Sequence, residues 1–229
     1  MKDRAKFIGP ALSICTLLLF AGCNWLRANQ PKEIAKTPTE QKKAALLKKI
    51  DRKFENPQAH FELGRLYQND GLWAEAEYRY NVALGFDPVH REAQAARVKV
   101  LADSGDTAKS ELLTDIYMNQ AASSAEASLL LGLAFQKQGL DEYALDCYQQ
   151  ALNLQPNSAK INRQIGYYYL SRNDKARAKD YLSRSFQLNP NQPEVAGELG
   201  RLGVAIKRPP RKTGEPVEKL DKIVERSDK

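Results

Sequence analysis

The stretch AEASLLLGLAFQKQGLDEYALDCYQQALNLQPNS, residues 125–158, contains two segments in which apolar residues recur every three or four positions. This spacing places the apolar side chains of each segment on one face of a helix. Gly139 separates the two segments and Pro156 follows the second, and both residue types commonly end helices. The stretch therefore predicts two amphipathic helices joined in a hairpin, which needs neighbours to bury its apolar faces.

The same pattern recurs when the frame is moved by 34 residues, a period that is typical of one family of helical repeats. Residues 57–90 and 159–192 carry small, aromatic and Pro residues at the matching positions. Gly71 and Asn173 occupy the position of the turn in these two frames. Each frame therefore predicts a further hairpin of the same kind.

Residues 91–124 form a degenerate frame between these hairpins. Val98 stands where the other frames have a Gly, and Ser110 and Tyr117 stand where they have small residues. With its four consecutive frames, the segment 57–192 resembles a tetratricopeptide-repeat protein. The resemblance implies an all-α fold, a right-handed α-solenoid of about four helical hairpins.

The segments before and after the array each predict a capping helix. Thr37 and Glu40 form a capping box at the start of the first helix, which carries an apolar stripe of Leu47, Ile50 and Phe54. The segment 193–206 predicts the closing helix, with Val195, Leu199 and Leu202 on its apolar face. The predicted organisation is a signal peptide (1–22), a tether and N-terminal helix (23–56), the repeats with their cap (57–206) and a flexible basic tail (207–229).

The first residues combine a basic start with a short apolar run, which is the anatomy of a secretory signal peptide. The run ends in Phe20-Ala21-Gly22-Cys23, which resembles a bacterial lipobox. The resemblance implies that Cys23 becomes the first mature residue and carries a thioether-linked diacylglycerol and an amide-linked acyl chain. An uncleaved apolar anchor is the alternative. By the same resemblance, Asn24 favours the periplasmic face of the outer membrane.

Charge varies strongly along the chain, whose net value is +7. Residues 57–158 hold seven Lys and Arg against fourteen Asp and Glu, whereas residues 159–192 hold seven against two. A nucleic-acid-binding protein has a continuous basic stripe instead. The pattern therefore argues against nucleic acid as a partner.

In tetratricopeptide arrays the first helix of each repeat lines a concave groove that binds protein or peptide partners. The resemblance places twelve residues there: Phe61, Arg65, Gln68, Asn69, Lys99, Leu129, Leu133, Gln136, Lys137, Arg163, Tyr167 and Leu170. Such a surface suits a peptide whose carboxylates meet the cations and whose apolar side chains pack on the rings and Leu residues.

The sequence contains no arrangement of residues that indicates catalysis or a metal site. His60 and His90 lie at different positions of one repeat, and Cys147 lies on a predicted core face. No metal-ligand, phosphate-binding or nucleophile motif is present. We therefore expect no enzyme, no small-molecule substrate and no cofactor other than the lipid on Cys23.

The function that these features predict is a lipid-anchored scaffold or adaptor of the bacterial envelope. It would help to assemble or localise a multiprotein complex such as a pilus, secretion or outer-membrane machine. The alternative is a non-catalytic accessory that regulates a peptidoglycan hydrolase.

Overall fold

The computed structural model describes residues 37–205, which contain ten α-helices and no strand. The helices are α2 (Pro38–Arg52), α3 (Pro57–Asn69), α4 (Trp73–Phe86), α5 (Arg91–Asp103), α6 (Thr107–Ala121), α7 (Ala125–Lys137), α8 (Asp141–Leu154), α9 (Ala159–Ser171), α10 (Lys175–Leu188) and α11 (Pro193–Arg201). The predicted signal peptide, Cys23, the tether and the tail at 207–229 lie outside the described residues.

The chain divides into two units, residues 1–42 and residues 43–229. Of the first unit, only residues 37–42 at the start of α2 are described. There the predicted capping box is confirmed, because the backbone N–H of Thr37 donates to Glu40 Oε2 at 2.7 Å and that of Glu40 to Thr37 Oγ1 at 3.2 Å. All four repeats belong to the second unit.

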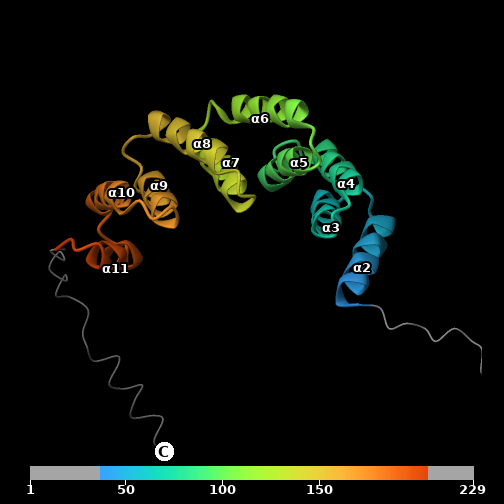
Figure 1. Cartoon of the computed structure of the whole chain (residues 1–229), viewed down its shortest axis with the longest axis horizontal. Helices are drawn as coiled ribbons and strands as arrows, with labels where there is room; N and C mark the ends of the chain where they lie inside the picture. The colour runs from blue at the N-terminus through green and yellow to red at the C-terminus, as the bar shows by residue number, and fades with distance from the viewer. Residues whose placement is uncertain (1–36, 206–229) are drawn as a thin grey trace, which may run out of the picture. The chain divides into compact units, whose positions relative to one another are not determined.

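Each repeat is a hairpin of two helices that pack on each other: α3 with α4, α5 with α6, α7 with α8, and α9 with α10. Consecutive hairpins also contact one another, so that neighbours in sequence are neighbours in space (Figure 1). The predicted all-α solenoid of about four hairpins is confirmed.

The turn between the two helices of each repeat uses one left-handed residue at the same position. Gly71, Gly105 and Gly139 have φ of 74°, 89° and 72°, and Asn173 has φ of 58°. Gly lacks the Cβ that disfavours this region, and Asn is among the few other residues that adopt it routinely. The 34-residue spacing of these four residues therefore has a backbone cause.

The start of the first helix in each repeat is also fixed by a residue at this spacing. Asn56, His90, Ser124 and Ser158 each accept a hydrogen bond from the backbone N–H three residues later, at 3.0, 3.3, 3.2 and 3.4 Å. Such caps satisfy N–H groups that have no partner within the helix. The degenerate second repeat keeps both its turn Gly and its cap.

The two helices of a repeat cross closely where the first helix carries a Gly. A Cβ on Gly64 or Gly132 would lie 2.6 Å from the ring of Tyr80 or Tyr148, and one on Gly166 would lie 2.6 Å from Leu182. These contacts are shorter than van der Waals contact, so only Gly fits there. The predicted role of the small residue in helix packing is confirmed.

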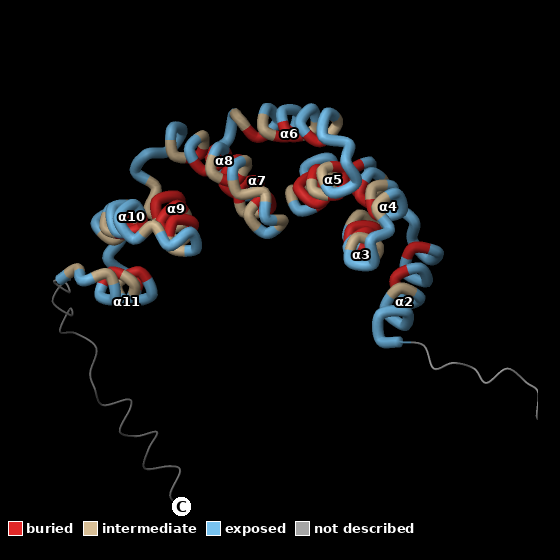
Figure 2. The backbone as a smooth tube through the Cα atoms, viewed as in Figure 1, coloured by how far each residue is buried: buried red, intermediate tan, exposed pale blue. Residues whose placement is uncertain are grey.

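One main apolar core runs through the repeats, from Phe61 in α3 to Ala178 in α10. Figure 2 shows that the buried residues lie on the sides of the helices that face neighbouring helices. Such a continuous core means that each hairpin is stabilised mainly by its own packing and by its neighbours.

The N-terminal helix α2 covers the open end of the first repeat through Leu46 and Ile50, which pack with Ala59 and Leu63 of α3. The predicted stripe is therefore partly wrong. Leu47 is exposed, and Phe54 lies beyond the end of α2, where its ring contacts the rings of His60 and Phe86. Leu46 and Ile50 share a helix face because they are four residues apart.

The closing helix α11 packs on the fourth repeat, where Val195 and Leu199 form a cluster with Leu182 of α10. This helix ends at Arg201 rather than at the predicted residue 206. Gly203 adopts a φ of 76°, and the N–H of Val204 returns to the carbonyl of Leu199 at 2.9 Å. This arrangement is typical of a helix that is terminated by a left-handed Gly.

Candidate functional site: a groove along the first helices

The first helix of every repeat is attached by a buried polar side chain to the preceding loop or, in the third repeat, to the last residue of the preceding helix. His60, Gln94 and Asn162 each bond to the carbonyl six residues earlier, at 2.9, 2.7 and 3.1 Å, and Ser128 bonds to the carbonyl of Ala121 at 3.0 Å. All four side chains are buried, so these bonds replace contacts with water. They fix where each first helix begins, and hence where the groove residues stand.

Two predicted groove residues are positioned by the tyrosines at the helix crossings. The hydroxyl of Tyr80 donates to Gln68 Oε1 at 2.5 Å, and that of Tyr148 donates to Gln136 Oε1 at 2.6 Å. Gln136 also accepts from Gln164 of the next repeat at 3.2 Å. These amides therefore connect helices within the array, and only part of their hydrogen-bonding capacity remains for a partner.

Burial separates the predicted apolar groove residues into two classes. Leu129 is only 1% exposed and belongs to the main core, so its assignment to the groove is wrong. Phe61 is 7% exposed but lines an open cavity, as does the half-buried Leu133. Leu129 and Leu133 lie one turn apart on α7. Leu129, which is nearer to the start of the helix, packs in the core, whereas Leu133 lines the cavity.

The predicted groove residues of the fourth repeat are engaged with α11. Arg163 pairs with Glu194 at 3.2 Å and donates to Gln192 at 3.2 Å. Tyr167 and Leu170 pack on the cluster that contains Val195 and Leu199. The closing helix thus occupies the face that a partner would use in this repeat.

The predicted cations of the first three repeats differ in their partners. Lys99 pairs with Asp103 at 2.6 Å on its own helix, and Lys137 pairs with Glu92 at 3.8 Å across two repeats. Arg65 is exposed and lies 5.9 Å from the centre of the Phe61 ring, and Asn69 is also exposed. Within residues 37–205 no carboxylate comes within 4.0 Å of Arg65 as an ion-pair partner.

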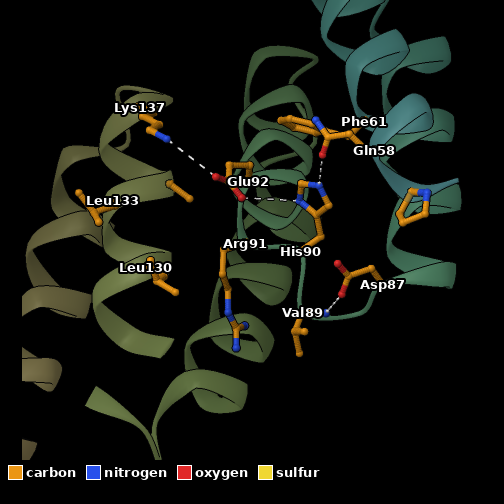
Figure 3. Close-up of a pocket in the computed structure, with 12 residues that line it drawn as sticks. Gln58, Phe61, Asp87, Val89, His90, Arg91, Glu92, Leu130, Leu133 and Lys137 are labelled. Atoms are coloured by element: carbon orange, nitrogen blue, oxygen red, sulfur yellow. Dashed lines mark hydrogen bonds and ion pairs between the residues drawn. The ribbon is translucent and has the colours of Figure 1, made fainter. Parts of the chain in front are cut away.

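An open cavity of about 740 Å³ lies where α3, α5 and α7 come together. Its walls include Phe61 from α3, Leu130, Leu133 and Ala134 from α7, and Val89 from the loop between α4 and α5. Figure 3 shows Phe61 and Leu130 on opposite sides of His90 and Glu92. The groove of the first three repeats is therefore open here.

Hydrogen bonds fix the polar groups at the centre of this cavity. His90 Nδ1 accepts the cap bond from Ala93, so Nε2 carries the proton and donates to Gln58 Oε1 at 3.2 Å. Glu92 pairs with Lys137 at 3.8 Å, and Asp87 Oδ1 accepts from the N–H of Val89 at 3.2 Å. Both carboxylates of the cavity thus have contacts of their own.

Arg91 is the remaining charged residue of the cavity lining. It is half-buried, and its Nη1 donates to Gln94 Oε1 at 2.9 Å. Burial lowers the pKa of Arg91, while the nearby Cys147 and Asp87 act in the opposite direction. A guanidinium has five N–H donors, so Arg91 retains donors for a further acceptor. In Figure 3 Arg91 and Lys137 extend to opposite sides of Glu92.

Nine of the twelve residues that line the cavity are absent from the predicted groove, among them Val89, His90, Arg91 and Leu130. The prediction used positions on the first helices alone, whereas Val89 and His90 belong to the loop before α5. The signal was nevertheless in the sequence, since Val89 is a large apolar residue in a loop where repeats three and four have Ser123 and Asn157.

Cys147 is completely buried in the main core, as its position in the repeat predicts. Burial raises the pKa of its thiol to about 12. The thiol therefore remains protonated near neutral pH, and a protonated thiol is a poor nucleophile.

Within residues 37–205 no three metal-ligating side chains come together. None of the helices described is both long and apolar enough to cross a bilayer.

The third and fourth hairpins match known family models. Residues 126–158 and 159–192 each match a model of the tetratricopeptide repeat. The first two hairpins share their turns, caps and polar attachments at the same spacing. This chain therefore contains tetratricopeptide repeats.

Two relatives are similar over somewhat more than half of the chain. The chain is 30% identical over 147 residues to human protein O-mannosyl-transferase TMTC1, a match that covers 61% of this chain and 16% of the relative. It is 28% identical over 153 residues to the type IV pilus assembly protein PilF of Pseudomonas aeruginosa, which covers 63% of this chain and 58% of PilF. In both cases the match spans less than two thirds of the relative.

Two solved structures have a similar arrangement of helices over part of the chain. The structure of Pseudomonas aeruginosa PilF matches with a TM-score of 0.38 and 26% identity, covering 64% of this chain and 67% of that one. A crystal structure of MamA matches with a TM-score of 0.37 and 16% identity, covering 70% of this chain and 99% of that one.

Proposed function

We propose that this protein is a lipid-anchored, protein-binding scaffold of the bacterial envelope that helps to assemble a multiprotein complex. The observation that carries the proposal is the similarity to PilF, a pilus assembly protein, over 153 residues. The complex is thus a pilus or a related secretion or outer-membrane machine. The protein performs no reaction itself, and its tetratricopeptide repeats supply the binding surface.

The lipid anchor is the second part of the proposal and is supported by the sequence alone. Cys23 follows a basic and apolar signal segment with small residues before it. Two or more acyl chains make membrane attachment effectively stable, since each buried methylene contributes about 0.8 kcal/mol. The array would then face the periplasm from the outer membrane.

The anchor is tested by labelling cells of the native host with radioactive palmitate and separating their membranes by density. Wild type should incorporate label and travel with the outer membrane, and Cys23→Ser should do neither. A Cys147→Ser variant controls for loss of a thiol in general. If wild type incorporates no label and still sediments with membranes, the apolar segment acts as an uncleaved anchor and the lipoprotein assignment is wrong.

The binding function is tested by affinity purification from detergent-solubilised membranes, with co-purifying proteins identified by mass spectrometry. We compare wild type with Leu130→Asp, which places a charge in the cavity, and with Leu154→Asp on α8. Leu130 and Leu154 are 43% and 45% exposed, so neither change disturbs the core. A component of an envelope machine should co-purify with wild type and with Leu154→Asp, and it should be absent from the Leu130→Asp purification.

Two results would contradict this proposal. One is a wild-type purification that yields no envelope-assembly component in stoichiometric amount. The other is turnover of cell-wall or peptide substrates by the purified full chain, which would assign it a reaction.

A further inference from the structure

The cavity between α3, α5 and α7 presents apolar side chains to solvent that the fold itself does not cover. Val89 is 60% exposed and Leu130 is 43% exposed, and both line the same cavity as Phe61 and Leu133. Large apolar groups that converge on a concave surface are typical of binding sites, because burying them in a partner removes that area from water.

The charges around the cavity favour one sign of partner. Its two carboxylates are already engaged, because Asp87 accepts from the Val89 N–H and lies near Arg91, and Glu92 pairs with Lys137 at 3.8 Å. Arg91 has only the amide oxygen of Gln94 as a hydrogen-bond acceptor within the described residues. Arg65 does not line the cavity but lies 5.9 Å from the centre of the Phe61 ring, which does, and it likewise has no ion pair among residues 37–205.

These contacts make an anionic group more favourable here than a cationic one. A carboxylate can form charge-assisted hydrogen bonds with a guanidinium whose donors are free. A Lys or Arg from a partner would instead have to compete with Lys137 for Glu92 and would lie near Arg91. Lys99 and Arg163, the other predicted cations, are already paired with Asp103 and Glu194.

We propose that this cavity binds an acidic peptide segment of the partner, inserting one large apolar side chain against Phe61, Val89 and Leu130. A carboxylate next to that side chain pairs with Arg91, and a second can reach Arg65. This inference rests on the proposed function, because it specifies which segment of a protein partner the array recognises.

The test is selection of a random peptide library displayed on phage against the immobilised full chain in detergent. Wild type should enrich peptides in which Asp or Glu stands within two positions of Phe, Trp, Leu or Ile. Arg91→Gln, which keeps a polar side chain of similar shape, should lose the enrichment of acidic residues but keep that of the apolar one. Leu130→Asp should lose both.

Two variants serve as matched controls. Arg163→Gln removes a guanidinium of the fourth repeat that is paired with Glu194, and Leu154→Asp adds a carboxylate on α8. Both should select the same peptides as wild type. Circular dichroism of each variant verifies that the helices are intact.

Affinity then measures the size of the effect. A fluorescein-labelled synthetic peptide with the selected sequence should bind Arg91→Gln at least about tenfold more weakly than wild type, and Arg163→Gln equally well. The difference for Arg91→Gln should shrink when the peptide carboxylate is replaced by an amide.

The proposal is overturned if selection yields basic or neutral peptides, yields none, or yields the same peptides with Arg91→Gln and Leu130→Asp. Such a failure is separate from failure of the proposed function. An envelope component that co-purifies and is lost with Leu130→Asp would keep the scaffold function and place recognition on a segment of different charge.

Discussion

The second and third repeats differ in which helix carries the large side chain where their two helices cross. In the third repeat Gly132 lies on α7 and the ring of Tyr148 on α8 fills the space beside it. In the second repeat Val98 lies on α5 and Thr114 occupies the corresponding position on α6. All four residues are buried.

The difference shows that a repeat can depart from the usual residues at both crossing positions and still form the same hairpin, because the two substitutions compensate in volume. The second helix loses volume from Tyr to Thr, and the first gains volume from Gly to Val. Ser110, also on α6, donates to the carbonyl of Val98 at 3.0 Å, which holds the two helices together without the tyrosine. The repeat that looks degenerate in sequence is therefore packed in a different way.

The largest expected effect comes from placing the second repeat's residue in the third. Gly132→Val would put a Cβ 2.6 Å from the buried Tyr148 ring, which has no room to move. Overpacking of this kind costs typically 1–3 kcal/mol, and we expect about 3 kcal/mol here, measured as the free energy of unfolding in urea.

The double variant Gly132→Val with Tyr148→Thr makes this comparison sharper. It reproduces the second repeat's pair and should recover part of the loss, so it should be more stable than Gly132→Val alone. Gly85→Val is the matched control, because no atom lies within 4 Å of a Cβ at that helical Gly. A double variant less stable than the single one would mean that the two positions are not a compensating pair.

The reverse exchange should also destabilise, although it restores the family residue. Val98→Gly leaves a cavity opposite Thr114 and adds a Gly to the interior of α5, which together cost about 2–3 kcal/mol. The measurement is again urea unfolding followed by circular dichroism. An unchanged or increased stability would show that Val98 is a defect in the second repeat rather than a compensation.

The tyrosine hydroxyls provide a smaller test of the same comparison. Tyr148→Phe removes the bond to Gln136 at 2.6 Å and should cost about 1 kcal/mol. Tyr117→Phe in the second repeat removes only a weak contact with Arg97 at 3.5 Å and should cost less. Equal losses would mean that the Tyr148 hydroxyl does not tie the first helix of its repeat to the second.

The sequence was sufficient to predict the hairpins because its turn, packing and cap residues recur at one spacing. Gly71, Gly105, Gly139 and Asn173 fix the turns through their own backbone conformation, which depends little on distant contacts. The sequence places the apolar stripe of α2 at Leu47, whereas the buried residue is Leu46, because a short amphipathic pattern does not determine which face meets the partner helix.

The groove was predictable only in part because the position of a residue in a repeat does not determine what covers it. Arg163 and Tyr167 have groove positions, yet α11 packs over them. Leu130 is one residue from a predicted groove position and faces the cavity, whereas Leu129 turns into the core. Such differences arise from the packing of neighbouring helices, which a position within the repeat does not contain.

The smallest expected effect concerns the four buried polar side chains that attach the first helices, of which only His60 can gain a proton. His60 Nε2 donates to the carbonyl of Phe54, and Nδ1 accepts from Arg79 at 3.5 Å, so both nitrogens are used by the neutral ring. Burial lowers the pKa of His60, the bond to the Phe54 carbonyl partly opposes this, and the charge of Arg79 adds a smaller lowering.

The sign of the resulting pH dependence follows from that lowered pKa. The unfolded chain takes up a proton near pH 6.5 and the folded one only at lower pH, so stability is complete above pH 6.5 and falls as the pH falls toward the folded pKa. His60→Asn, which places the fourth repeat's residue in the first, should lower stability at pH 7.5 but flatten its decline toward pH 5. Urea unfolding at both values measures this. If the free energy of unfolding falls by the same amount between pH 7.5 and pH 5 in wild type and variant, His60 protonation does not weaken the first repeat. Its histidine would then respond to pH no more than the asparagine of the fourth repeat does.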